Sequence, residues 1–304
     1  MRIFGLADPK LNFESCNPQN LHSAPDLLRK STAAPAASKL GAFGSLELIL
    51  TREKRDVRRL QKLRYHVFYE QGRAIGGVAT RFTRRDSDSF DNVCDHLMVV
   101  DRSARSSPIG RSPVIGTYRL LRQEIAKKYG GFSIAREFDI FDLLERHAGL
   151  RFLELGRSCV LSTYRTKRTI ELLWHGVWRY VRDHHIDVMI GCASFATTDA
   201  AKLARPLSYL HHFALAPESW QAAPRSKWRV EMNRMSKHEI DIKAAWRELP
   251  PLIKGYLRVG ALVGDGAAID EQFGTTDVLI VMPVSAIRAR YINYFGENAR
   301  RFAG

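Results

Sequence analysis

The chain has 304 residues, of which 45% are hydrophobic and 10% aromatic, so it can build a substantial core and is not globally disordered. The net charge of +15 indicates an anionic partner, either a nucleic acid, an anionic membrane surface or an acidic protein. The sequence opens without a signal peptide, and no apolar stretch approaches the ~18 residues of a membrane span. We therefore expect a cytoplasmic protein, soluble or peripheral on the inner face of the cytoplasmic membrane.

Residues 1–44 are expected to form a disordered or loosely attached tail. STAAP and PAASKLGAFGS are rich in alanine, serine, proline and glycine and lack a sustained apolar period. Order should begin with a short strand, LELILT, at 46–51. Residues 52–72 carry apolar side chains at helical spacing with basic residues opposite, which predicts an amphipathic helix that Gly72 ends. The polar stretch 73–92 is predicted to be a loop.

Strands and helices alternate in the middle of the chain. HLMVVD at 96–101 and VIGTYRLL at 114–121 flank a turn rich in serine, proline and glycine, which predicts a hairpin. Two apolar strands at 151–160 and 186–195 then enclose an amphipathic helix at 169–181. A strand, helix and strand of this length predict a right-handed parallel crossover. The sheet is therefore expected to be mixed, antiparallel early and parallel around the strand at 151–160.

The C-terminal third predicts more helix and one more strand. DIKAAWREL at 241–249 is typical of a helix, a proline pair opens a helix over 250–264, and TDVLIVMP at 276–283 predicts a strand. The sequence has no internal repeat and no clear internal boundary. We expect one domain over residues 45–300.

The cysteines and paired histidines do not indicate a metal site. Four cysteines lie far apart without CxxC or Cys/His spacing, and we expect small buried hydrophobes in a reducing cytosol. Adjacent histidines point different ways on a helix, and none has a carboxylate at zinc spacing. We expect no bound metal.

The strand RFLELGRSCV at 151–160 places two charges and a glycine in an apolar run. Glu154 and Arg157 would point to opposite faces of a regular strand, because their separation is odd. A bulge at Gly156 would reset the alternation and bring both side chains to one face, with backbone N–H groups freed for a ligand. A carboxylate base, a cation and free amides suit attack by an amine on a carbonyl. The alternative is a structural ion pair in a half-buried strand.

Other charged residues lie upstream at regular spacings. RYHVF places Arg64 and Phe68 one helical turn apart, DSFD places Asp88 and Asp91 in a loop, and GTYR places Arg119 in a strand. Each alone is typical of a solvated charge. Together, and in this order before ELGRSCV, they resemble the signature of acyl-homoserine-lactone autoinducer synthases. That resemblance implies a GNAT-like acyltransferase that uses acyl carrier protein. The matching positions are Arg64, Phe68, Asp88, Asp91, Arg119, Glu154 and Arg157.

Two departures point to a relative of that family. A tryptophan expected shortly after RYHVF is missing from 69–90, and the chain continues about a hundred residues beyond the usual end of such enzymes. CDHLMVVD, IDVMIGCASF, LSYLHH and PPLIKGYLRVGALVGDGAAIDEQFGTTDVLIVM resemble the ornithine-lipid N-acyltransferases over roughly residues 46–295. This resemblance implies transfer of a 3-hydroxyacyl group from acyl carrier protein to the α-amino group of L-ornithine. The product would be lyso-ornithine lipid.

The junction LSTYRTKRTIELL supports a carrier-protein donor. Enzymes of this fold that use coenzyme A carry a glycine-rich loop there, whose amides hold the pyrophosphate. Here the junction has no glycine and carries Arg165, Lys167 and Arg168 instead. These cations should bind the 4'-phosphopantetheine phosphate and the acidic carrier protein, so no separate cofactor is expected. The alternative is a basic loop at a helix start, where positive charge is mildly unfavourable.

A mechanism follows as a hypothesis for these residues. Glu154 is expected to be the base, directly or through water, and Arg157 to stabilise charge or orient the acyl chain. Asp88 and Asp91 would hold substrate ammonium groups, while Arg64 or Arg119 would bind the carboxylate or fix the aspartates. His96 is a second candidate base, although a lone histidine at a strand start is more often structural.

Two other classes of protein compete with this reading. An autoinducer synthase would carry out the same chemistry on S-adenosylmethionine. A non-catalytic basic protein would bind a membrane surface, a carrier protein or nucleic acid, but no recognition motif or basic stripe is present, so no nucleic acid is expected. The expected fold is therefore α/β, a GNAT-like mixed sheet with an antiparallel N-terminal half, a bulged central strand and helices on both faces.

Overall fold

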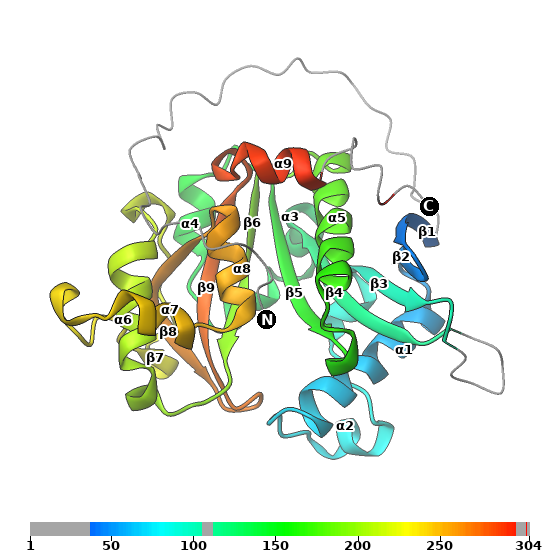
Figure 1. Ribbon diagram of the computed structural model, residues 1–304, viewed down its shortest axis with the longest axis horizontal. Helices are drawn as coiled ribbons and strands as arrows, with labels where there is room; N and C mark the ends of the chain where they lie inside the picture. The colour runs from blue at the N-terminus through cyan, green and yellow to red at the C-terminus, as the bar shows by residue number, and fades with distance from the viewer. Residues whose placement is uncertain (1–36, 105–111, 296–301, 303–304) are drawn as a thin grey trace.

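The apolar runs of the sequence pair into one mixed sheet in the computed structural model, which describes residues 37–104, 112–295 and 302 (Figure 1). Within these residues the order is β1-β2-β3-β4-β5-β6-β9-β8-β7. Only β5 and β6 run parallel, and every other neighbouring pair is antiparallel, as expected. The strands are β1 (Ala37–Phe43), β2 (Leu46–Thr51), β3 (Asp95–Asp101), β4 (Val114–Arg122), β5 (Phe152–Val160), β6 (Val188–Phe195), β7 (Arg229–Val230), β8 (Leu262–Asp270) and β9 (Thr275–Pro283).

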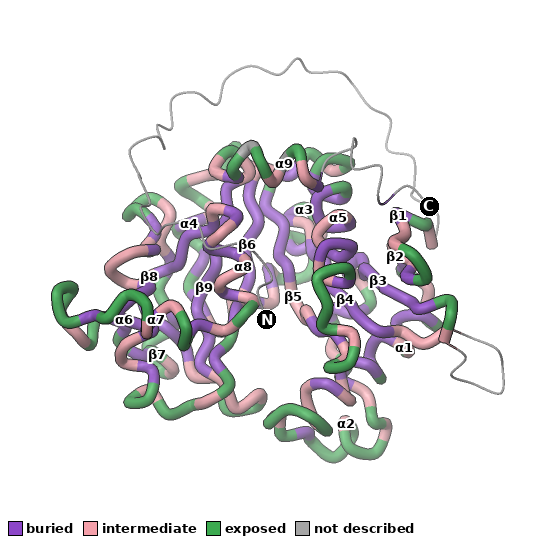
Figure 2. Tube along the Cα trace, viewed as in Figure 1, coloured by how far each residue is buried: buried purple, intermediate pink, exposed green. Residues whose placement is uncertain are grey.

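Helices cover both faces of the sheet, as the sequence predicts, because successive strand residues point to opposite sides. Leu97 and Val99 of β3 belong to the core beneath α5, α6 and α8, whereas Met98 and Val100 contact Leu60 of α1 on the other face. Figure 2 shows the buried strands between partly exposed helices. The helices are α1 (Lys54–Tyr65), α2 (Val78–Thr83), α3 (Gln123–Ala126), α4 (Phe141–Arg146), α5 (Lys167–Asp183), α6 (Ala204–Ala214), α7 (Ile242–Glu248), α8 (Pro251–Val259) and α9 (Ala289–Phe295).

The expectation of a disordered or loosely attached tail is wrong for residues 37–43. Ala37–Phe43 forms β1, an edge strand paired with β2, in which Leu40 is buried. Its backbone is also held by Arg179, which donates to the Leu40 carbonyl at 3.0 Å. Residues 1–36 of the expected tail lie outside the described residues.

Two further boundaries differ from expectation. The helix predicted over 250–264 ends at Val259, because Gly260 takes a φ of 122° and Leu262 begins β8. The predicted loop 73–92 contains α2 and a 3₁₀ turn, Ser89–Asn92. The helix predicted over 52–72 is α1 followed by a π-helix, His66–Glu70. No helix in the described parts of the chain is long and apolar enough to cross a membrane.

A bulge does interrupt β5, as predicted, but it lies at Arg157, one residue after the expected Gly156. Gly156 keeps a regular partner in Arg119, and the register slips where Tyr118 faces Arg157 and Ser158. Arg157 is the bulged residue, with a φ of 51° in the left-handed region. The expectation that Gly156 forms the bulge is therefore wrong.

The two parallel strands part just before this bulge. Pairing between β5 and β6 ends at Glu154, opposite Ile190. At the point of separation, a Cβ on Gly191 would lie 2.5 Å from the Leu155 carbonyl oxygen, so only glycine allows this approach. Beyond it, the β6-facing edge of β5 has no strand partner within the described residues. This parting of the strands sets the position of the candidate site.

Candidate active site

Arg64 anchors a buried network on one face of the sheet. Its side chain is fully buried, and its Nε donates to Asp86 at 2.8 Å. Nη1 and Nη2 donate to the two carboxylate oxygens of Asp91 at 2.9 and 2.6 Å. Burial raises the pKa of Asp91, but the bonds and charge of Arg64 outweigh this and hold it well below its ordinary value. Arg64 is therefore placed to fix the aspartates, one of its two expected roles.

Arg119 on β4 extends the network toward the strand gap. It is 3% exposed and donates to both oxygens of Asp88 at 2.6 and 2.8 Å, and to Asp91 at 3.2 Å. Asp88 also caps the following 3₁₀ turn by accepting from the Phe90 amide. Asp91 and Arg119 are thus fully engaged inside the protein, and their placement supports a positioning role. The predicted contact of Arg64, Asp91 and Arg119 with substrate stays a prediction.

Glu154 lies at the inner end of the network. It is 4% exposed, and its Oε2 accepts from the backbone amides of Ser133 and Ile134 at 2.7 and 3.4 Å. The Ser133 hydroxyl donates to Oε1, and Arg119 Nη2 donates to that hydroxyl at 3.3 Å. Glu154 thereby holds the 3₁₀ turn Ser133–Arg136 against β5. Because Ser133 is partly exposed, it connects the buried carboxylate with the surface.

Arg157 joins the same network from the bulge. Its Nη2 donates to Asp88 at 3.2 Å, and its Nε lies 3.3 Å from Asp86. Glu154 and Arg157 therefore reach the same side of β5, as the bulge predicted. Arg157 remains 27% exposed, unlike Arg64 and Arg119, and Nε has no hydrogen-bond acceptor among the described residues. It is the arginine of this network best placed to meet a substrate carboxylate.

Phe68 closes the site from the π-helix. Its ring packs edge-on against Phe273 in the β8–β9 turn, with centroids 5.6 Å apart. The Arg157 guanidinium lies 4.9 Å from the same Phe273 ring. The backbone carbonyl of Gln272 also accepts from Ile75 at 2.7 Å. The β8–β9 turn therefore borders the site.

His96 is poorly suited to act as a base. It is fully buried, and its Nε2 lies 3.1 Å from the Asp91 carbonyl oxygen. Burial lowers its pKa to about 4, so the imidazole stays neutral and Nε2–H donates to that carbonyl. The geometry supports the structural alternative for this residue.

Sequence reasoning missed an acidic cluster beside the network. Oxygen or sulfur atoms of Glu137, Cys192 and Asp277 lie within 4.8 Å of one another. Glu137 follows the turn that Glu154 holds, while Cys192 and Asp277 come from the paired strands β6 and β9. Asp277 could have been found from the sequence, because it is a charged residue at the start of the apolar run TDVLIVMP. Glu154 was singled out in the same way, as a charge within an apolar strand.

The predicted carrier-protein residues lie at the start of α5. Arg165, Lys167 and Arg168 are all exposed, and Arg165 donates to the Val160 carbonyl at the end of β5. Lys167 pairs with Glu171 at 3.6 Å, and Arg168 lies over Phe43. This basic edge follows directly from the strand that carries Glu154 and Arg157.

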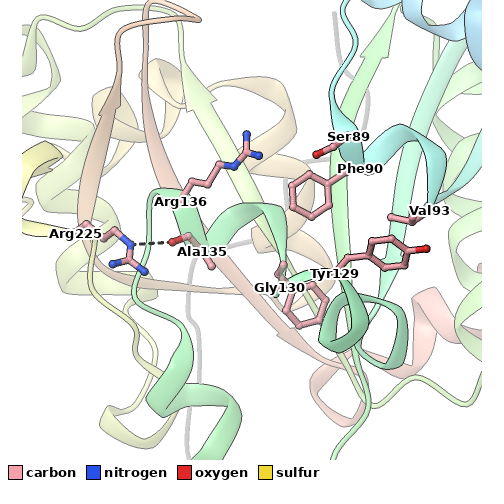
Figure 3. A pocket seen from close by; sticks show the side chains of 9 residues that line it. Ser89, Phe90, Val93, Tyr129, Gly130, Ala135, Arg136 and Arg225 are labelled. Atoms are coloured by element: carbon pink, nitrogen blue, oxygen red, sulfur yellow. Dashed lines mark hydrogen bonds between the residues drawn. The ribbon is translucent and has the colours of Figure 1, made fainter.

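A separate pocket of about 340 Å³ lies next to the network (Figure 3). Phe90 and Arg136 face each other in its lining, with the guanidinium 5.3 Å from the ring. Arg225 donates to the Ala135 carbonyl at 2.8 Å. None of the residues predicted for the site lines this pocket.

The sheet, its parted parallel strands and the bulged central strand define a GNAT-type acyltransferase. The family model for an acetyltransferase (GNAT) domain matches residues 63–175. The chain is 48% identical to an L-ornithine N(alpha)-acyltransferase of Rhizobium meliloti (strain 1021), covering 91% of this chain and 93% of that protein. It is 46% identical to the protein of the same name from Agrobacterium fabrum (strain C58), over 91% and 94% of the two chains. The chain therefore belongs to the L-ornithine N(alpha)-acyltransferase family.

One solved structure is distantly similar to this chain. It is that of FeeM, an N-acyl amino acid synthase from uncultured soil microbes, with a TM-score of 0.47 and 10% sequence identity. The match covers 83% of this chain and 98% of that chain.

Proposed function

We propose that this enzyme transfers a 3-hydroxyacyl group from acyl carrier protein to the α-amino group of L-ornithine. The observation that carries the acceptor is the identity of 48% over nearly the full length of a relative named for that reaction. The site supports it, because the candidate base Glu154, the partly exposed Arg157 and the acidic cluster lie near the point where β5 and β6 part. The product would be lyso-ornithine lipid.

The chemistry follows from the positions of Glu154 and Ser133. The α-ammonium of ornithine must lose a proton before its nitrogen attacks the thioester carbonyl. Glu154 takes this proton through the Ser133 hydroxyl or a water molecule. The new C–N bond then forms and the C–S bond breaks. The nitrogen releases its second proton, and the leaving thiolate takes up one proton to become the free thiol. Backbone N–H groups of the unpaired edge of β5 polarise the thioester carbonyl.

The donor is proposed to dock on the basic edge of α5. Three exposed cations, Arg165, Lys167 and Arg168, follow the reacting strand within a few residues. A carrier protein presents one phosphate on an acidic surface, which such an edge attracts.

Charge reversal at this edge tests the donor. Lys167→Glu/Arg168→Glu should raise the KM for acyl carrier protein about 10-fold or more, with a smaller effect at high salt. In steady-state kinetics with acyl-pantetheine, a donor without the carrier protein, the KM for the donor should change much less. The matched control is Lys202→Glu/Lys243→Glu, two exposed lysines on other elements. An equal rise in KM for both double variants would contradict docking at α5.

A peripheral membrane contact is proposed at α2, which projects from the domain (Figures 1 and 2). Ile75, Val78 and Phe82 are 70%, 81% and 89% exposed. Arg81 and Arg84, both exposed, flank them. Apolar side chains ringed by arginines fit an anionic bilayer, into which a lipid product is released.

Phe82→Ser should weaken vesicle binding. A phenylalanine side chain that inserts into the bilayer contributes about 1.5–3 kcal/mol to binding. Without it, the affinity for phosphatidylglycerol vesicles should fall roughly 10- to 100-fold in co-sedimentation. Phe141, which is 62% exposed on α4, provides the matched control Phe141→Ser. Binding that both substitutions weaken equally, or neither weakens, would contradict a contact at α2.

The reaction itself is tested by product mass. Purified protein is incubated with 3-hydroxyacyl carrier protein and single amines, and the lipids are analysed by mass spectrometry. N-acyl-ornithine is expected. Acyl-homoserine lactone formed only with S-adenosylmethionine would identify an autoinducer synthase instead.

A further inference from the structure

Among the described residues, no lysine or arginine pairs with the acidic cluster formed by Glu137, Cys192 and Asp277. Glu137, Asp277 and the more distant Asp270 repel one another, and within the described residues none forms an ion pair with lysine or arginine. Cys192 donates its thiol to Glu137 Oε2 at 3.5 Å. Burial raises the pKa of Glu137 and of Asp277, and the positive charge of Arg157 opposes this for both acids. Glu137 directly follows the turn that Glu154 holds, so the cluster adjoins the network.

Asp277 is only partly satisfied: burial raises its pKa, and the nearby hydroxyls of Thr275 and Ser194 lower it. The residue is 6% exposed, and its Oδ1 is buried without a partner in the described part of the chain. A buried carboxylate oxygen without a donor is costly, and such atoms are normally satisfied by protein, water or ligand. A ligand that brings N–H donors and positive charge would satisfy this oxygen.

We propose that Glu137 and Asp277 bind the side-chain ammonium of the amino-acid acceptor. This inference rests on the proposed function. A primary ammonium carries three N–H donors and is protonated at neutral pH, and burying it in this form requires a counter-ion. The α-amine must be neutral to react, so the side-chain ammonium is the group that needs the pair of acids. Arg157, the partly exposed arginine of the network, then receives the carboxylate.

A divalent metal fits the same atoms less well. Zinc sites in proteins have four protein ligands, or three that include histidine, whereas this cluster offers two carboxylates and one thiol. Calcium and magnesium prefer six or more oxygen ligands, whereas this cluster offers two carboxylates. An ammonium group needs no more than these.

Specificity for a cationic acceptor tests the proposal. In Glu137→Gln and Asp277→Asn, kcat/KM for ornithine should fall at least about 30-fold, because a buried charge loses its partner. The KM for the acyl donor and the activity on norvaline, which lacks the side-chain amine, should stay within about threefold. Asp183→Asn, exposed on α5, is the control. An equal loss with ornithine and norvaline would overturn the subsite.

Thermal unfolding gives a readout that does not depend on turnover. Burial, with the charges of Asp277 and Asp270, raises the pKa of Glu137, so ionising it at higher pH destabilises the free protein. Cys192, Arg157 and Glu154 are the other charged or titratable groups that act on the cluster. Glu137→Gln should therefore raise the Tm of the free protein more at about pH 8 than at about pH 5, and abolish the stabilisation by ornithine.

The binding readout also separates this inference from the proposed function. If the enzyme fails to acylate ornithine, the proposed function fails, but ornithine binding that Glu137→Gln abolishes still supports the subsite. The opposite result would be that Zn²⁺ or Mg²⁺ alone raises the Tm of the wild type whereas ornithine does not. If both variants also lost this stabilisation by metal, the cluster would be a metal site and the ammonium subsite would be overturned.

Discussion

Glu154→Gln is expected to abolish turnover while leaving the fold intact. Glutamine has nearly the same shape and still accepts from the Ser133 amide, but it cannot take a proton from the acceptor amine. We expect kcat to fall at least about 10²-fold, the lower end of what general base catalysis contributes. The measurement is kcat under saturating donor and ornithine, with circular dichroism to show that the fold is retained. Undiminished activity would rule out Glu154 as the base.

Ser133→Ala separates proton transfer from support of the turn. The substitution removes the hydroxyl that donates a hydrogen bond to Glu154 but keeps the backbone amide of residue 133, which also donates to this carboxylate. If Glu154 takes the proton through water, Ser133→Ala should retain most activity and keep the wild-type pH profile. If the hydroxyl relays the proton, both variants should lose kcat and raising the pH should partly rescue them. Equal, pH-independent losses in the two variants would mean that Glu154 only anchors the turn.

Arg64→Met is expected to cost about 3–5 kcal/mol of unfolding free energy, the usual effect of removing one partner from a buried ion network. Methionine fills much of the space but leaves Asp86 and Asp91 without their shared cation. Urea unfolding followed by circular dichroism measures the loss. Arg58→Met, exposed on the same helix, should change stability by less than about 0.5 kcal/mol.

The pH dependence of this loss has a definite sign. The pKa of Asp91 is lowered in the folded state, so its contribution is present above its ordinary pKa of 3.8 and disappears on acidification. The difference between wild type and Arg64→Met should therefore shrink as the pH falls toward 3.8 and below. A difference that stays constant with pH would contradict a network held together by charge.

The sheet was predictable where apolar runs are long. The runs that became β3, β5, β6 and β9 are buried, and a strand's alternation or continuous apolarity reports burial directly. The edge strand β1 was missed because one face is open and its sequence has the composition of a tail. β8 was missed because small residues, Gly264, Gly266 and Ala267, weaken the signal of a strand.

The candidate site was only half visible in the sequence. Glu154 and Arg157 stood out as charges in an apolar strand, and the predicted bulge does bring them to one network. Its position differs by one residue, because Arg157 is fixed in the left-handed conformation beside Asp86 and Asp88, which are remote in sequence. Glu137 and Asp277 were missed because β9 inserts beside β6 out of sequence order.

A crystal structure of the protein with N-acyl-ornithine would test the central claim, that the amine acceptor binds where β5 and β6 part. The expected complex has the carboxylate within hydrogen-bond reach of Arg157 and the side-chain ammonium between Glu137 and Asp277. The acylated nitrogen should lie beside Ser133, toward Glu154. Density for the ligand in the pocket between Phe90 and Arg136, with Arg157 contacting only Asp86 and Asp88, would contradict the account.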